Sequence, residues 1–122
     1  KINLYITHLD AGDENGDILV REIQLKELSE HINNINNNYA IIICGDFNID
    51  YYQSIEIIDQ FTKKNNLNIL RWDNITNVDE MIDYVFYRSG ENHKMTMLDY
   101  KINKVLYNKS DHLPIEFIIM IE

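Results

Sequence analysis

The apolar residues of the chain follow two periods, one typical of strands and the other of helices. They alternate with polar residues over positions 1–7 and 95–107, and they form an unbroken run over 40–43. Over positions 18–35 and 54–64 they recur at the three- and four-residue spacing of a helix. Alternation is typical of a half-buried strand, and a short unbroken run is typical of a strand covered on both faces. The pattern therefore predicts a mixed α/β chain.

The order of these segments predicts how the first part of the chain is connected. A strand, a helix and a second strand form a crossover unit, whose two strands are expected to lie parallel. Asp17 is a suitable N-cap for the helix, while Arg21 and Gln24, taken alone, are ordinary solvated residues on one of its faces. The Asn-rich residues 33–38 predict the end of this helix and a loop. Residues 67–70 are expected to form a short strand or an extended turn, and further strands are expected at 82–87 and 114–121.

The unbroken apolar strand ends in polar residues that can bind a cation. Gly45 allows the backbone to turn sharply, and Asp46 and Asn48 follow two positions apart. A carboxylate and an amide oxygen that face one ligand suit a hard cation such as Mg²⁺, or a phosphate held through that cation. An Asx-turn that only closes the loop explains the same residues. The rest of the chain decides between these two interpretations.

Polar side chains also stand at the ends of other predicted strands. Each one alone is compatible with a structural residue or a polar turn. Together they supply what hydrolysis of a phosphoester requires, namely groups that hold a metal against the phosphoryl oxygens and a base that takes a proton from water. The candidate residues are His8, Asp46, Asn48, Asp83, Asp111 and His112.

Four short motifs, in this order and at about these spacings, resemble those of the endonuclease/exonuclease/phosphatase superfamily, which has the DNase I-like fold. The motifs are Thr7-His8-Leu9, Gly45-Asp46-Phe47-Asn48, Ile82-Asp83-Tyr84 and Ser110-Asp111-His112. Weaker markers are similar to the neutral, Mg²⁺-dependent sphingomyelinase branch. These markers are Arg21 with Gln24, Trp72 with Asp73, and Thr76 with Asn77.

The resemblance covers essentially all of residues 1–122 and implies the architecture. The superfamily fold is a four-layer α/β (α+β) sandwich of two packed sheets with helices outside. The chain matches about its C-terminal half, which is expected to form one sheet flanked by helices within a single domain.

The resemblance also implies which residues hold the metal and the phosphate. Asp46 and Asn48 would hold or orient the attacking water and the scissile phosphate. With Asp111 they would bind the metal, which is Mg²⁺ or another divalent cation such as Mn²⁺.

The proton-transfer groups follow from the same resemblance. His112 would be the general base or a donor to a phosphate oxygen, with Asp83 fixing its tautomer through the other ring nitrogen. His8 would stabilise the phosphoryl oxygens or protonate the leaving group. Whether Asp46 or His112 is the base stays open.

The superfamily's principal metal-binding Glu, and an Asn that contacts phosphate, belong to the N-terminal half. No Glu of this chain can be assigned that role. Because Lys1 already falls within a predicted strand, we expect a longer protein in which the N-terminal half of the domain is the partner of this chain. The alternative is a remnant that does not turn over substrate by itself.

The composition bears on the substrate and the compartment. A formal net charge of −9 repels a nucleic-acid backbone and so favours a lipid phosphodiester such as sphingomyelin over nucleic acid. An endonuclease or exonuclease acting on DNA or RNA is the alternative.

The single cysteine, Cys44, excludes an internal disulfide and is expected to be a small buried residue. No apolar run is long enough to span a bilayer, and the sequence leaves open whether the protein is cytoplasmic or secreted.

Overall fold

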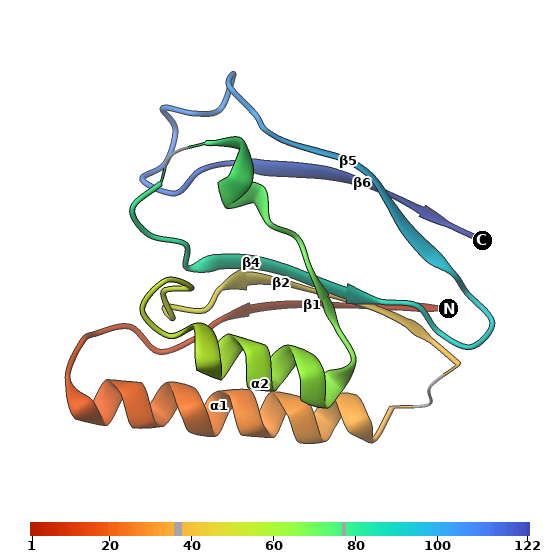
Figure 1. Cartoon of the computed structure of the whole chain (residues 1–122), viewed down its shortest axis with the longest axis horizontal. Coiled ribbons are helices and arrows are strands. Elements are labelled where there is room, and N and C mark those ends of the chain that lie inside the picture. The colour runs from red at the N-terminus through yellow and green to blue at the C-terminus, as the bar shows by residue number, and fades with distance from the viewer. Residues whose placement is uncertain (36–37, 77) are drawn as a thin grey trace.

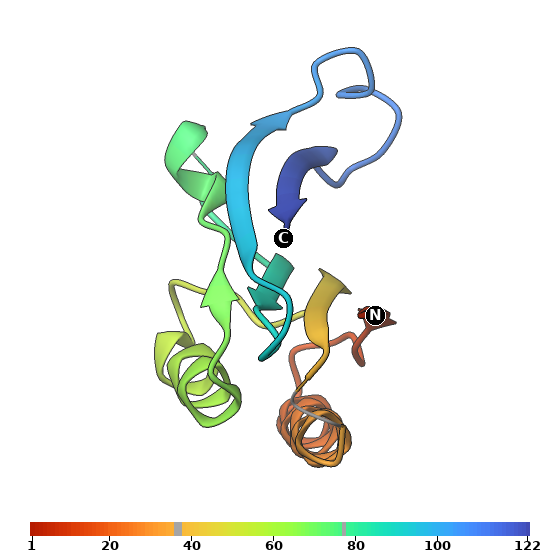
Figure 2. The same cartoon turned by 90° about the vertical axis from the view of Figure 1, so that its right-hand side faces the viewer.

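The computed structural model describes residues 1–35, 38–76 and 78–122, which form three layers (Figures 1 and 2). Helices α1 (Asn15–Asn33) and α2 (Ile55–Asn65) lie on one face of a four-stranded sheet, and a two-stranded sheet lies on the other. The chain is therefore mixed α/β, as its apolar pattern predicts. The strands are β1 (Ile2–His8), β2 (Ala40–Asp46), β3 (Asn68–Ile69), β4 (Asp83–Arg88), β5 (Met95–Ile102) and β6 (Ile115–Ile121), and the 3₁₀ helix η1 (Trp72–Ile75) precedes β4.

The larger sheet has the strand order β1-β2-β4-β3. β1 and β2 are parallel, which confirms the predicted crossover through α1, and β4 is antiparallel to β2. The prediction of a single sheet is incomplete, because β5 and β6 pair only with each other among the described strands. They fold back over the sheet because its second face is apolar as well and also requires a covering layer.

The face of the larger sheet that the helices cover holds the main hydrophobic core. Four aromatic rings pack there, with centroids 5.2 to 6.3 Å apart and mostly in edge-on contacts, which the ring quadrupoles favour. The rings are those of Phe47, Phe61, Tyr84 and Phe86. Because side chains alternate along a strand, the positions of Tyr84 and Phe86 place Asp83 on the opposite face.

The register of the sheet brings three candidate residues into one row. His8 pairs with Asp46 across the parallel ladder, and Asp46 pairs with Asp83 across the antiparallel ladder. Paired residues point to the same face of a sheet, so the three side chains emerge side by side at one end. The segment between β5 and β6 returns to this end, at the left in Figure 1, and carries His112.

The bounds of two predicted elements need correction. α1 begins earlier than expected, since Glu14 is its N-cap, and Asp17 instead accepts a hydrogen bond from the Glu14 backbone N–H at 3.2 Å as part of a capping box. The strand predicted over 95–107 ends at Ile102. There the Asn103 side chain accepts a hydrogen bond from the backbone of Val105 at 3.0 Å, which turns the chain.

Three further points complete the comparison with the sequence. Cys44 is only partly buried, because it points to the face that the β5–β6 sheet covers incompletely. Asn36 and Asn37 of the predicted loop, and the branch marker Asn77, lie outside the described residues. Of the helices described, none is long and apolar enough to cross a membrane.

Candidate active site

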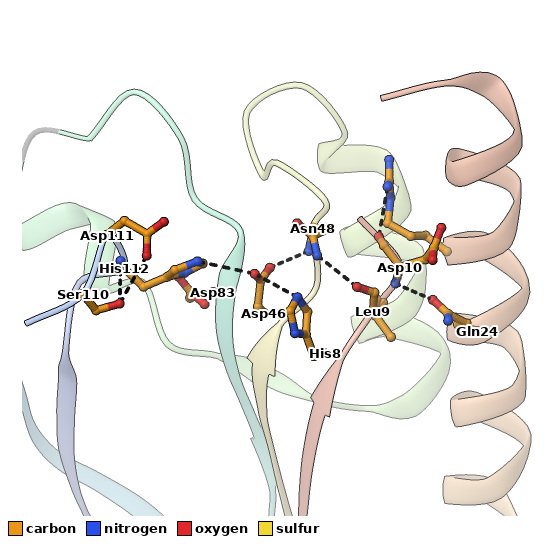
Figure 3. A network of polar contacts seen from close by, with 11 residues as sticks. His8, Leu9, Asp10, Gln24, Asp46, Asn48, Asp83, Ser110, Asp111 and His112 are labelled. Carbon is orange, nitrogen blue, oxygen red and sulfur yellow. Dashed lines mark hydrogen bonds and ion pairs between the residues drawn. The ribbon is translucent and has the colours of Figure 1, made fainter. Parts of the chain in front are cut away.

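Asp46, the last residue of β2, lies at the centre of the candidate site (Figure 3). Its Oδ1 accepts a hydrogen bond from the backbone N–H of Asn48 at 2.8 Å. Its Oδ2 lies 3.5 Å from Nε2 of His8 and 3.6 Å from Nε2 of His112. Both distances are too long for good direct hydrogen bonds. Oδ2 is therefore available to a ligand that both imidazoles can also reach.

His112 is held by the carboxylate of Asp83. The distance between Nδ1 of His112 and Oδ2 of Asp83 is 2.7 Å. An ionised carboxylate only accepts hydrogen bonds, so Nδ1 must carry the proton. Nε2 then faces Asp46, and in the neutral ring it has a free lone pair. The hydrogen bond to Asp83 thus favours one tautomer and one direction of the imidazole, and the catalytic role of this pair stays a prediction.

The two members of this pair have shifted pKa values for different reasons. The hydrogen bond and the negative charge of Asp83 stabilise the imidazolium and raise the pKa of His112 above its usual 6.5. Burial raises the pKa of Asp83, and the hydrogen bond from His112 opposes that rise. The His112 side chain remains 39% exposed, so a substrate can reach it.

The backbone conformation of Asn48 and one hydrogen bond fix the direction of its side chain. Its backbone is left-handed, with φ of 50°, and its Nδ2 donates to the carbonyl of Leu9 at 2.9 Å. The backbone N–H of Leu9 donates in turn to the carbonyl of Asp46 at 2.9 Å. Because the amide nitrogen is committed to Leu9, Oδ1 is the atom that Asn48 offers to a cation or a water.

Gly45 is required for a different reason from the sharp turn expected of it. It lies within β2 with φ of +146°, and a Cβ added there would come within 1.8 Å of the carbonyl oxygen of Thr7. Only glycine lets β1 approach β2 so closely. This contact brings His8 and Asp46 together.

Two residues on α1 support the site although they were expected to be solvated. Arg21 is buried, and its Nη1 donates to the carbonyls of Asp10 at 3.0 Å and Gly12 at 2.7 Å. Oε1 of Gln24 accepts from the backbone N–H of Asp10 at 2.9 Å (Figure 3). Both side chains therefore hold the loop that follows His8. Their spacing on the helix gave no sign of this, because only the tertiary fold brings the loop against α1.

The donor atoms of the site fit a divalent cation. Asp46, Asp83 and His112 have ligand atoms within 4.8 Å of one another. Carboxylate oxygens together with Oδ1 of Asn48 are the hard donors that Mg²⁺ prefers. Asp111, also predicted as a ligand, is exposed on the loop, with Oδ1 3.4 Å from Oγ of Ser110, and is not part of this group among the described residues. Its role as a ligand stays a prediction.

Comparison with solved structures finds proteins of similar fold. No protein-family model and no curated protein sequence matches the chain. The human Nocturnin catalytic domain, whose structure holds a bound sulfate anion, aligns with 96% of the chain at 21% identity and a TM-score of 0.69. Beta toxin from Staphylococcus aureus aligns with 96% at 19% identity and a TM-score of 0.50. An endonuclease/exonuclease/phosphatase family protein from Bacteroides thetaiotaomicron aligns with 95% at 17% identity and a TM-score of 0.49.

The chain spans about half the length of the solved structures it matches. It covers 46% of the Nocturnin domain and 50% of beta toxin. The alignment with Nocturnin extends over nearly the whole chain, and this confirms the fold that the four sequence motifs imply. The chain has the DNase I-like fold, over about half of the extent of that fold.

Proposed function

We propose that the chain, residues 1–122, is the C-terminal part of a metal-dependent phosphodiesterase domain. One observation carries the proposal: the carboxylate of Asp46 lies between the imidazoles of His8 and His112, and Asp83 orients the second imidazole. Hydrolysis of a phosphodiester needs negative charge to be balanced on the phosphoryl oxygens while a proton leaves water and another reaches the leaving group. Two imidazoles that flank one carboxylate can serve these requirements together.

The exposure of the two histidines supports a division of their roles. Nε2 of His112 takes the proton of the attacking water or donates to a phosphate oxygen, and Asp83 stabilises the imidazolium that forms. The His8 side chain is 70% exposed, so it can reach the phosphoryl oxygens or the leaving group. Asp46 is the alternative base.

A divalent cation, Mg²⁺ or Mn²⁺, would be held by Asp46 and Asn48, with Asp111 from the loop and the Glu that the superfamily contributes from its N-terminal half. When bound, it supplies positive charge against the phosphoryl oxygens. The protein's own contribution is to hold the carboxylate and the amide oxygen side by side, which the turn from Asp46 to Asn48 achieves.

The substrate is a lipid phosphodiester such as sphingomyelin, and the net charge of −9 supports it against a polyanionic nucleic acid. The test is hydrolysis of sphingomyelin in mixed micelles and of plasmid DNA by the full-length protein, in Mg²⁺ and in excess chelator. We expect release of phosphocholine that requires the cation. Nicking of DNA without lipid hydrolysis would replace the lipid proposal by a nuclease. No activity on either substrate would favour a non-catalytic remnant.

The partner of this chain is the N-terminal half of the same domain. Apolar side chains are exposed on the edge strand β1, where Leu4 is 58% and Ile6 is 77% exposed, and on β6, where Ile118 is 53% exposed. Exposed apolar surface at sheet edges marks an interaction site. The N-terminal half of the fold is the segment that would cover it.

Co-expression of the two halves as separate polypeptides tests this partner. We expect a stable one-to-one complex that Ile6→Asp abolishes. Val105→Asp is the matched control, since Val105 is 86% exposed on the β5–β6 loop and outside these strands. Failure of the halves to copurify, or equal effects of the two substitutions, would contradict the proposal.

A further inference from the structure

Trp72 contacts the backbone of the residue that orients His112. The indole is buried, with 3% of the residue exposed, and its Nε1 donates to the main-chain carbonyl of Asp83 at 2.8 Å. Asp83 is the first residue of β4, and its side chain holds the imidazole at 2.7 Å. The indole of Trp72 and the imidazole of His112 are thus both hydrogen-bonded to one residue, Asp83.

The indole N–H replaces a missing backbone donor at the edge of the sheet. β3 pairs with β4 only through Asn68 and Ile69, and the next backbone donor, Leu70, bonds to the carbonyl of Val85 at 2.9 Å. The chain then turns away into η1. Two residues further along this edge, the carbonyl of Asp83 lies beyond the pairing with β3. Without the indole this carbonyl would lose its donor, and the start of β4 would be held by hydrogen bonds from the β2 side alone. Trp72 extends the ladder by one hydrogen bond.

The sequence neighbours of Trp72 hold the turn that carries the indole. Arg71 and Asp73, one on each side of it in the sequence, form a two-point bridge, with Nε to Oδ1 at 2.8 Å and Nη2 to Oδ2 at 2.6 Å. Oδ2 of Asp73 also accepts from the hydroxyl of Tyr52 at 2.7 Å, and the guanidinium lies 4.2 Å from the ring centre of Tyr51. These contacts hold the turn around Trp72 against the loop that follows β2, and this loop also carries Asn48.

We propose that Trp72 is a positioning residue for the proposed hydrolysis. Its indole N–H fixes the backbone of Asp83, so the carboxylate of Asp83 holds His112 with Nε2 facing Asp46. The inference rests on the proposed role of His112, but the geometric part of it can be measured without any activity.

Trp72→Phe tests the inference because it keeps an aromatic ring and removes the donor. In the full-length protein we expect kcat to fall about 10-fold with KM unchanged, which is the low end of the cost of losing an outer partner of a reacting group. By proton NMR, the signal of the hydrogen on Nδ1 of His112 should lie far downfield in the unmodified protein. In the variant it should broaden or move upfield, because the bond to Asp83 is no longer held in one geometry.

Tyr84→Phe is the matched control. Tyr84 also bonds a backbone carbonyl through its side chain, with its hydroxyl 2.6 Å from the carbonyl of Ile49, but it lies on the helix-covered face of β4. We expect Tyr84→Phe to lower the melting temperature while kcat and the His112 proton signal stay unchanged. If Trp72→Phe fails to fold, Arg71→Lys keeps the indole but removes the two-point bridge that holds its turn. This variant should lower kcat and change the His112 proton signal in the same direction, by smaller amounts.

The outcomes separate this inference from the proposed function. If Trp72→Phe lowers only the melting temperature, as Tyr84→Phe does, the residue is structural and the inference is wrong. If the NMR signal responds to Trp72→Phe but the unmodified protein hydrolyses neither substrate, positioning stands and the proposed function fails.

Discussion

The candidate site has a strand side and a loop side, and the two sides are held in different ways. On the strand side, His8, Asp46 and Asp83 belong to paired strands of one sheet, so the backbone ladders fix their spacing. On the loop side, His112 lies in the exposed segment between β5 and β6 and is held by its bond to Asp83. Changes to the backbone pairing of the strand side should therefore cost stability, and loss of the His112 side chain should cost chemistry.

His112→Ala should have the largest effect and should act on chemistry alone. Removal of a positioned acid–base group is expected to cut kcat by about 10² to 10⁴-fold in the complete protein, with far less change in substrate binding. Because the side chain is 39% exposed, the melting temperature should change little. Steady-state kinetics and thermal unfolding of the same preparation check both parts.

His31→Ala is the control for the loss of an imidazole. His31 lies on α1 and contacts the ring of Tyr5 edge-on, away from the site. Turnover should survive in this variant. A His112→Ala protein that melts earlier yet turns over normally would show that Ser110-Asp111-His112 is only a polar turn.

Gly45→Ala should be the most damaging change to the strand side. The new Cβ would collide with the backbone of Thr7 at a positive φ, so β1 must separate from β2. We expect a loss of about 3–5 kcal/mol in the free energy of unfolding, measured with urea. Gly16→Ala is the control, since a Cβ there meets nothing within 4 Å, and it should stabilise α1 by about 0.5–1 kcal/mol. Equal effects of the two substitutions would contradict the close approach at Gly45.

Asp73→Asn tests the support beneath Asp83. Asp73 is buried and bonded by Arg71 and Tyr52, and these bonds lower the pKa of its carboxyl below the usual 3.8 against the opposing effect of burial. We expect a loss of about 1–2 kcal/mol at neutral pH, because the Arg71 side chain is partly exposed. Because the pKa of Asp73 is lower in the folded state, its carboxylate stabilises the folded protein at pH values above 3.8. This stabilisation is lost as the pH falls through the folded-state pKa. The difference in the free energy of unfolding between the unmodified protein and Asp73→Asn should therefore disappear at acid pH. A difference that does not depend on pH would argue against the ion pair of Asp73 with Arg71.

Asp83→Asn should give the smallest effect and should link the two sides. The amide keeps the ring in place but loses the charge, so kcat should fall by about 10-fold, less than for His112→Ala. If neutral His112 is the base, activity rises with pH through a pKa above 6.5. In Asp83→Asn this rise of activity with pH should occur at lower pH, because the imidazolium of His112 loses the negative charge that stabilises it. If the pH–activity profile is the same in both proteins, the rise in activity comes from the titration of another group.

The strand side could be predicted from the sequence more fully than the loop side. Asp46 and Asn48 directly follow an unbroken apolar run, so a local pattern locates them at the end of a buried strand. The bond between Asp83 and His112 depends on β5 and β6 folding back as a separate sheet. Alternation over the corresponding residues looks the same in either sheet, so it could not reveal this.

Arg21 shows a second limit of local pattern. A charged residue on an amphipathic helix is normally solvated, and the helical spacing fits that interpretation. It is buried because two backbone carbonyls of the preceding loop satisfy its guanidinium. That pairing exists only after the loop has folded over α1, so the residue types alone do not predict it.

The central place of β2 determines how the strand side can form during folding. Ile2 of β1 pairs with Ala40, and Cys44 pairs with Val85 of β4, so both ladders join segments far apart in the chain. Such contacts form slowly, because the entropy of closing long loops is lost before any pairing compensates for it. The β5–β6 pair closes a shorter loop and can form earlier. A chain with only one ladder complete still lacks either His8 or Asp83 beside Asp46, so the row of three side chains should appear in a single late and cooperative step.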